Sequence, residues 1–287
     1  MIISTLYGGL GNQMLIYAMV RALAYNNNTT FAFDINSGFK RDFLYNRRLA
    51  LDGFNVTIKE AQFLSFNFPF GRYFRRISKW VGWNILAPHY SFITEKRPLY
   101  FESDLFVKRI SNAYLCGYWH SYRYFEKIEG ILRNDFTFKK NFSKDVYNEA
   151  EDILVNKSKA IALGIRRYQE CKENVVDVLD ASYYNKAMEI FSNRIENPIF
   201  YVFTQEPDWA KSNLDKKFTI KFISKKEGDD RAIDDMYLMS LFNKYIISNS
   251  TFYWWGAWLS KDSDKTVITP SNWVNRDCVP SSWIKIE

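Results

Sequence analysis

The chain has 287 residues, 47% of them hydrophobic, which suits one large domain or two of ordinary size. Its 39 Lys and Arg residues outnumber 32 Asp and Glu residues, and the net charge of +7 favours an anionic partner such as a nucleotide or an acidic lipid surface. This excess is too small to indicate nucleic acid as a partner, and no nucleic-acid-binding signature is present.

The cysteines and the start of the chain predict a cytoplasmic protein. Cys116, Cys171 and Cys278 are far apart and form no zinc-binding pattern, which favours a reducing compartment. Glycines and polar residues interrupt residues 8–13, so the start does not resemble a signal peptide. No apolar run is long enough to span a bilayer.

The first residues predict a β-α-β unit. Residues 2–6 favour a strand, residues 8–13 a glycine turn, and the apolar spacing from Met14 onward a helix that stops at the asparagines 26–28. Residues 31–34 then favour a second strand, which ends in an acid.

The glycine turn has three interpretations. A dinucleotide-binding fingerprint fits Gly9, Gly11 and the later Asp34, but Met14 stands where its third glycine belongs. Alternatively, the turn backbone approaches a sugar or phosphate of another ligand, together with Asn12 and Gln13. In the third interpretation the turn binds no ligand.

Residues 36–112 show little regular pattern apart from one segment. On a helix over 71–81, four basic residues share one face and apolar residues another, as in helices that lie at a membrane surface. The functional interpretation is peripheral contact with the inner membrane surface, and the more common alternative is an ordinary surface helix. A strand is then expected at 114–119, and a helix through 128–132.

A polar stretch at 137–150 predicts a boundary between an N-terminal domain, 1–145, and a C-terminal domain, 146–287. After it, strands and helices alternate, which predicts a second parallel sheet. We expect helices from residue 181, with Ser182 as a cap, and from Asp234 or Asp235. The expected strands are 160–165, 199–204, 218–222, 245–247 and, as the last one, 267–269.

Two arginines follow the first strand of this second half. Arg166 and Arg167 come directly after the apolar run 160–165. Ligands of open α/β sheets bind beyond the carboxyl ends of the strands, and two guanidinium groups there suit a diphosphate. A solvated strand end is the equally common alternative.

A second candidate stretch passes from a strand through small polar residues into an aromatic helix. Asn249, Ser250 and Thr251 stand at the predicted start of this helix, where they can cap its N–H groups or leave them to bind phosphate. Capping alone is the more common case. The coincidence of this helix start with the arginine pair in one parallel sheet favours a diphosphate.

Four motifs in order resemble those of the bacterial α-1,2-fucosyltransferases of glycosyltransferase family 11. Residues 8–14 resemble the family's opening G-G-L-G-N-Q-M, and residues 117–125 resemble G-Y-W-Q-x-x-R/x-Y/F-F. Residues 202–204 correspond to V-F-S, which two acids follow in the family, and residues 249–258 resemble N-S-S-F-S-W-W-G/A-A-W. Each motif is modest, whereas the ordered set is specific.

The chain departs from the family at two places. The family's arginine motif is H-x-R-R-G-D, whereas residues 164–169 read G-I-R-R-Y-Q, so that Gly164 replaces the histidine and Gln169 the aspartate. Of the two acids after 202–204, only Glu206 remains, because Gln205 takes the first position. Diphosphate recognition carries over from the family, but details of base and sugar recognition do not.

The resemblance implies an α/β, GT-B-like fold of two Rossmann-like domains facing a cleft. The N-terminal domain would be on the acceptor side, and the C-terminal domain would bind a GDP-sugar. It implies an inverting transfer of L-fucose from GDP-fucose to the 2-hydroxyl of a galactose-type residue in an O-antigen or capsule glycan. The acceptor would be an oligosaccharide or a lipid-linked glycan. The GDP-sugar is a co-substrate, and neither a cofactor nor a metal is expected.

The expected catalytic residues are Arg166, for charge on the leaving diphosphate, and Glu170, which lies near a strand end. The expected donor-binding residues are Gly9, Gly11, Asn12, Gln13, Arg166, Arg167, Glu206, Asn249, Ser250 and Thr251. The triplet 262–264 reads D-S-D, like the D-x-D of metal-dependent transferases, but its polar surroundings favour a solvated surface turn.

Three alternatives stay open. The chain could use another GDP-6-deoxysugar, it could be a family member that binds glycan or nucleotide without catalysis, or, less favoured, it could be a dinucleotide-dependent enzyme. Gly164 bears on the first, because a glycine there is expected to leave room beside the arginines and so to relax the choice of sugar or base.

Overall fold

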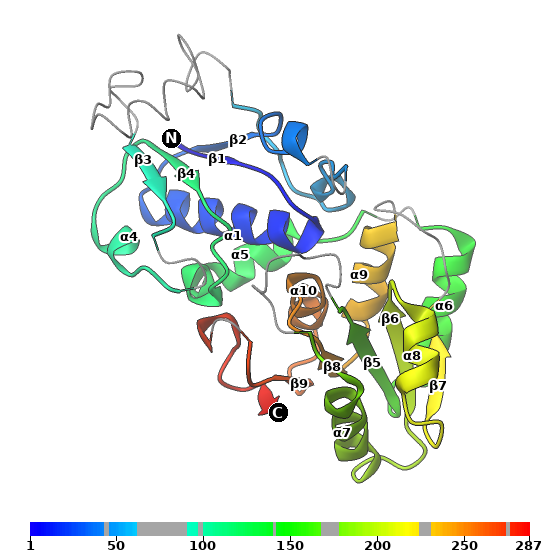
Figure 1. The fold of residues 1–287 in the computed structure, drawn as a ribbon. Coiled ribbons are helices and arrows are strands. Elements are labelled where there is room, and N and C mark those ends of the chain that lie inside the picture. Colours follow the sequence, from blue (N-terminus) through cyan, green and yellow to red (C-terminus); the bar gives the residue numbers. More distant parts are fainter. Residues whose placement is uncertain are drawn as a thin grey trace. The chain divides into compact units, whose positions relative to one another are not determined.

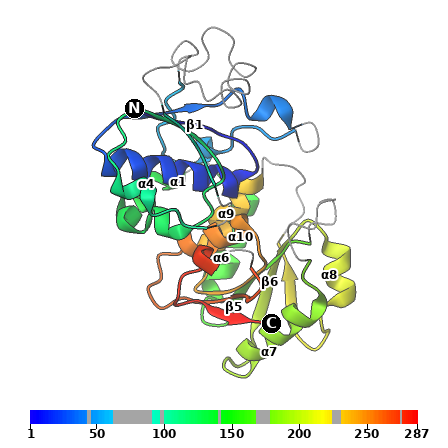
Figure 2. The same ribbon diagram turned by 60° about the vertical axis from the view of Figure 1, so that its left-hand side comes forward.

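The computed structural model describes residues 1–42, 46–61, 91–96, 100–139, 142–167, 178–223, 231–273 and 276–287. The chain divides into two compact units, Met1–Thr137 and Phe138–Glu287 (Figures 1 and 2). This division falls slightly before the predicted boundary at residue 145. The predicted basic helix over 71–81 lies outside the described residues.

The first unit is built on a four-stranded sheet with the order β2-β1-β4-β3, in which all neighbouring strands are parallel. Its strands are β1 (Ile2–Thr5), β2 (Phe31–Asp34), β3 (Ser91–Thr94) and β4 (Ala113–Cys116). Its helices are α1 (Leu10–Asn26), α4 (Asp104–Val107) and α5 (Glu129–Asp135), with short 3₁₀ turns at Phe39–Arg41, Leu51–Gly53, Tyr122–Tyr124 and Glu126–Ile128. The β1-α1-β2 unit was predicted, whereas β3 is half-exposed and has no apolar pattern in the sequence that predicts it.

The glycine turn is shorter than predicted, because α1 begins at Leu10. Gly8 has a φ of +76°, a conformation that favours glycine, and Gly9 stands at the helix N-cap. The Gln13 side chain is only 1% exposed. Its Nε2 donates to the carbonyls of Gly8 and Arg48, each at 2.9 Å, and its Oε1 accepts the Ala50 N–H at 2.9 Å. Gln13 therefore ties the turn to the loop around residues 48–50.

Asp34 has a structural role at the end of β2. Its carboxyl group is buried and accepts the backbone N–H groups of Asn36 and Ser37, at 3.2 and 2.9 Å. The other carboxyl oxygen accepts the Tyr114 hydroxyl at 3.0 Å. The dinucleotide interpretation needs this carboxylate for a ribose, so the geometry argues against that interpretation.

The second unit is built on a six-stranded sheet with the order β10-β9-β8-β5-β6-β7, and again all neighbouring strands are parallel. Its strands are β5 (Ala160–Ile165), β6 (Ile199–Thr204), β7 (Thr219–Phe222), β8 (Lys244–Ile247), β9 (Thr266–Pro270) and β10 (Ile284–Ile286). Its helices are α6 (Lys144–Val155), α7 (Ala181–Ser192), α8 (Pro207–Asn213), α9 (Ala232–Ser240) and α10 (Thr251–Leu259), and a 3₁₀ turn spans Arg276–Cys278.

Several predictions for this unit need correction. The last strand is β10, not 267–269. The sequence did not indicate β10, because a three-residue edge strand carries too short a pattern to be recognised. Part of the polar stretch at the predicted boundary is the amphipathic helix α6. The cap of α7 is Asp180, whose carboxylate accepts the N–H groups of Ser182 and Tyr183; Ser182 lies inside the helix.

The central strand β5 has two different faces. Ile161, Leu163 and Ile165 pack into a core with residues of α7 and α8, and Figure 2 shows these two helices on the same side of the sheet. The other face carries only Ala160, Ala162 and Gly164. These small residues leave space on that face for large side chains.

We predict that Gln13→Ala lowers the free energy of unfolding by about 2 kcal/mol, because it leaves the Ala50 N–H and two carbonyls without their side-chain partner. Chemical denaturation followed by circular dichroism measures this change. The exposed Gln205→Ala serves as the matched control and should stay within about 0.5 kcal/mol of the parent. Equal stability of the Gln13→Ala variant and the parent would contradict the structural role.

Candidate functional site

The carboxyl edge of the second sheet brings together most of the candidate residues of this unit. Strand β5 lies between β6 and β8, with Ile165 paired to Thr204 and the Ser248 N–H donating to the Gly164 carbonyl at 3.0 Å. The segments that follow these strands therefore start side by side. They carry Arg166, Arg167, Glu206 and residues 248–251, as the parallel arrangement predicts.

Arg167 is held in a defined position. Its Nη1 lies 3.3 Å from Oε2 of Glu206, and the two side chains are 17% and 28% exposed. Its Cζ lies 4.4 Å from the ring centroid of Trp209, on α8. Stacking and the ion pair together orient the planar guanidinium group. Glu206 is thus a partner of the arginine, and this pairing makes it a poor candidate for a catalytic base.

The sequence did not indicate Trp209, because a stacking contact between residues on two elements leaves no local pattern. The buried Tyr184 hydroxyl escaped prediction for the same reason, whereas the buried Ser248 belongs to the predicted stretch of small polar residues before the aromatic helix. Burial raises the pKa of Tyr184 above its ordinary value, while the Arg166 backbone, the Ser248 side chain and the Arg167 charge oppose that rise. The Tyr184 ring lies 6.1 Å from the ring of Trp209, on which Arg167 stacks. Neither hydroxyl has a partner with good hydrogen-bond geometry among the described residues.

Helix α10 begins at this edge of the sheet. Ser250 is its N-cap residue with an extended backbone, and the Ser250 side chain makes no capping hydrogen bond. Asn249 and Ser250 are buried, and Thr251 is half-buried. A helix N-terminus carries partial positive charge and suits an anion, as the arginines do. The capping hydrogen bond that the sequence suggested as one role of these side chains is therefore absent for Ser250.

Gly164 does not leave an empty space beside the arginines. A Cβ at this position would lie between 2.5 and 2.8 Å from three carbons of the Tyr253 ring, well inside contact distance. The ring of Tyr253, on α10, fills the volume that the sequence interpretation left open. The argument that a vacancy at Gly164 relaxes the choice of donor is therefore wrong.

The other candidate residues lie in the first unit or outside the described residues. Gly11, Asn12 and Gln13 belong to the first turn of α1, and Gly9 precedes it. The Arg47 guanidinium approaches Gly9 so closely that a Cβ there would lie 2.8 Å from its Nη1. A larger residue at position 9 would therefore displace the Arg47 side chain. Glu170 and Gln169 lie outside the described residues.

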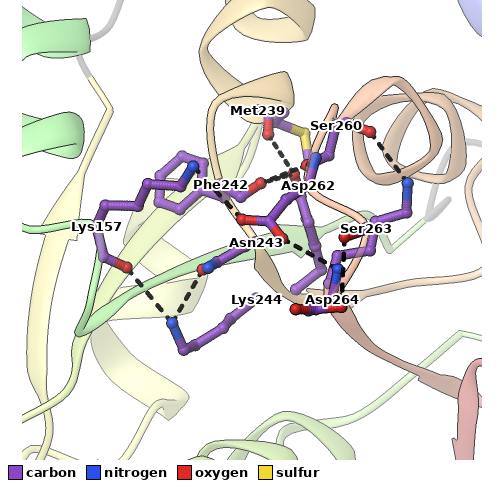
Figure 3. Close-up of polar contacts among 11 residues, drawn as sticks. Lys157, Met239, Phe242, Asn243, Lys244, Ser260, Asp262, Ser263 and Asp264 are labelled. Carbon is purple, nitrogen blue, oxygen red and sulfur yellow. Dashed lines mark hydrogen bonds and ion pairs between the residues drawn. The ribbon is translucent and has the colours of Figure 1, made fainter.

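The D-S-D triplet lies at the opposite edge of the sheet from the arginines. It precedes the amino end of β9, a strand that spans roughly 15 Å. As Figure 3 shows, Asp262 contacts Lys157 at 3.5 Å and accepts the Asp264 N–H at 3.1 Å. The Asp264 N–H is the main cause that lowers the pKa of Asp262. Over the described residues, no group of three or more His, Cys, Asp or Glu side chains could hold a metal ion.

Among the curated relatives, two bacterial proteins are similar to this chain over 94% or more of its length. The alpha-1,2-colitosyltransferase of Escherichia coli is 29% identical, and the alignment covers 100% of this chain and 99% of the relative. The O-antigen biosynthesis glycosyltransferase WbnK of Escherichia coli is 26% identical over 94% of each chain. The galactoside alpha-(1,2)-fucosyltransferase 2 of Bos taurus is 24% identical over 51% of this chain and 44% of the relative.

The solved structure of the fucosyltransferase NodZ from Bradyrhizobium has the same type of fold. It superposes with a TM-score of 0.53 at 16% sequence identity, over 89% of this chain and 91% of that one. The predicted α/β, GT-B-like fold class is confirmed. In the part of the chain that the structure describes, no helix is both long and apolar enough to cross a membrane.

The arginine pair and the helix start therefore lie at the carboxyl ends of neighbouring parallel strands, in a chain with the α/β fold that the resemblance implied. The model of glycosyl transferase family 11 matches residues 98–285, and the chain belongs to this family of glycosyltransferases.

Proposed function

We propose that this glycosyltransferase moves a 6-deoxyhexose of the fucose type from a GDP-linked donor to the 2-hydroxyl of a galactose-type residue in a bacterial surface glycan. The observation that carries the proposal is Arg167, oriented by Glu206 and Trp209 beside the start of α10. Membership of family 11 and the α-1,2 linkage in the names of the relatives support it.

The proposed reaction is a direct displacement with inversion at the anomeric carbon of the donor sugar. The bond from this carbon to the diphosphate oxygen breaks, and a bond to the acceptor oxygen forms. The acceptor hydroxyl loses its proton to a base, for which Glu170 is the remaining candidate. Arg166 and Arg167 stabilise the negative charge that grows on the diphosphate, with support from the N-terminus of α10. No step of this scheme needs a metal ion.

Fucose is the first candidate for the sugar, and colitose, which is fucose without its 3-hydroxyl, is the second. The second is favoured by the relative named alpha-1,2-colitosyltransferase, which aligns over the full length of this chain. The relatives with fucosyltransferase names align over half of it. A site that hydrogen-bonds a hydroxyl rejects the donor that lacks it far more strongly than an apolar pocket rejects an added hydroxyl. The ratio of kcat/KM for the two donors therefore reports whether the site hydrogen-bonds the 3-hydroxyl.

A donor panel tests this function. The protein is incubated with a β-galactoside acceptor and with GDP-fucose, GDP-colitose or GDP-mannose, and the product is identified by mass spectrometry. We expect transfer from a 6-deoxy donor with kcat/KM at least about a hundredfold above that for GDP-mannose. A preference for colitose above tenfold selects the second candidate. Transfer from GDP-mannose alone, or GDP binding without transfer from any donor, contradicts the proposal.

We predict that Arg166→Ala lowers kcat by about a hundredfold or more, because it removes a preorganised charge partner worth about 3 kcal/mol of barrier. Arg167→Ala should weaken GDP binding as well, which isothermal titration calorimetry measures. Arg194→Ala removes an exposed arginine that precedes β6, at the other end of the sheet, and serves as the control. The donor-site assignment fails if both site variants keep their GDP affinity or if Arg166→Ala keeps its turnover.

Transfer should survive an excess of EDTA, because the arginines and the helix start can balance the diphosphate charge. The variant Asp262→Asn should keep its kcat as well, since Asp262 pairs with Lys157 at the far edge of the sheet. Initial rates with chelator, and after addition of Mn²⁺, measure this. Loss of activity that Mn²⁺ restores in the parent, but not in Asp262→Asn, would show that the triplet binds a catalytic metal.

A further inference from the structure

We propose that Tyr253 is a positioning residue for the donor site, and that Tyr253 and Gly164 form a reciprocal pair. In this pair, the tyrosine ring occupies the space of the side chain that glycine lacks, and the tyrosine hydroxyl holds the strand ends that carry the arginines. The positioning role rests on the proposed function, whereas the reciprocal packing does not.

The packing of Tyr253 against Gly164 follows from the two faces of β5. Gly164 continues the small face that Ala160 and Ala162 begin, and Tyr253 lies over it. The tyrosine is only 6% exposed, so its ring has little freedom to move aside. Because three ring carbons lie within 2.8 Å of the point that a Cβ would occupy, any larger residue at 164 would displace the ring and strain α10.

The Tyr253 hydroxyl lies at the ends of two strands. The Tyr253 hydroxyl lies 3.0 Å from the carbonyl oxygen of Ile165 and 2.9 Å from that of Phe203. Ile165 is the last residue of β5, directly before Arg166, and Phe203 is the next-to-last residue of β6. The single hydroxyl proton, shared between these two carbonyl oxygens, therefore links the two strands immediately before the segments that carry Arg167 and Glu206.

The ion pair links the same two segments beyond the strand ends. Arg167 and Glu206 close the same gap between the two segments, 3.3 Å apart, beyond the strand ends. In addition, Tyr253 belongs to the first turn of α10, so one side chain links both strand ends to the helix start. A shift of this side chain would move the arginines and the helix N-terminus relative to each other, and these are the groups proposed to hold the diphosphate.

The motifs quoted for the family show the same exchange in sequence. Their arginine motif has histidine at the position of Gly164, and their helix motif N-S-S-F-S has serine at the position of Tyr253. This chain therefore has the small residue on the strand and the large one on the helix, where the family pattern has the reverse. Two such departures that meet in space, ring against glycine, are readily explained as one compensating change.

The test combines four variants with one control. Gly164→His and Tyr253→Ser each restore one half of the family pattern, and the double variant restores both. Tyr253→Phe keeps the ring and removes only the hydroxyl. Tyr245→Phe is the matched control, since the buried Tyr245 hydroxyl also contacts two backbone carbonyl oxygens, of Met239 and Phe242, but lies near the amino end of β8.

The packing is measured by thermal unfolding without ligand. We expect Gly164→His and Tyr253→Ser each to have a lower unfolding temperature than the parent. The double variant should regain most of the decrease in unfolding temperature that Gly164→His causes. If the decrease in unfolding temperature of the double variant equals the sum of the two single decreases, the reciprocal pair is overturned. A Gly164→His variant that fails to fold alone but folds together with Tyr253→Ser supports the pair in the same way.

The positioning role is measured by kcat and KM for the donor and by the affinity for GDP. We expect Tyr253→Phe to lower kcat about tenfold or more, as misplaced catalytic groups do, with a smaller change in donor KM. Tyr245→Phe should lose similar thermal stability and keep its kcat. The positioning role is overturned if the two tyrosine variants have the same kcat, or if Tyr253→Phe matches the parent. A parent protein that binds no GDP refutes the proposed function and the positioning role together, while the unfolding measurements still decide the packing.

Discussion

The parallel pairing of β5 with β6 on one side and β8 on the other is the constraint on which the candidate site depends. Parallel strands end at one edge of the sheet, so segments that are separated by about 40 residues or more in sequence start side by side. At this edge the arginine pair, Glu206 and the start of α10 meet. An edge with two guanidinium groups and a helix N-terminus is electrostatically suited to a multiply charged anion.

In the second unit, the packing of the core also positions residues of the candidate site. One face of β5 carries large aliphatic residues against α7 and α8, and the other carries only alanine and glycine. The small face admits the aromatic helix α10, and with it Tyr253, whose hydroxyl reaches the strand ends. The many aromatic residues of this chain thus have a structural use here, since the rings of Trp254, Trp255 and Trp258 contact one another along α10.

Membership of family 11 accounts for the overall arrangement, and the departures from its motifs show where this chain differs. The arginines are kept, but Trp209 and Tyr184 beside them lie outside the quoted motifs, and Tyr253 stands where the helix motif has serine. At the opposite edge of the same sheet, the carboxylate of Asp262 is engaged by Lys157 and a backbone N–H. The arginine pair and this acidic turn are therefore separated by the full length of the strands.

From the sequence alone we predicted the β-α-β start, the strands β2, β5 and β6 with their bounds, and the arginine pair beyond β5, because apolar runs and glycine turns are local signals. The half-exposed β3 and the three-residue β10 were missed, since short edge strands lack such a signal. Three features emerged only from the folded structure: Gln13 holds a loop, Glu206 and Trp209 orient Arg167, and Tyr253 fills the space above Gly164. Each of these depends on contacts between residues at least 35 positions apart in sequence, which no local pattern encodes.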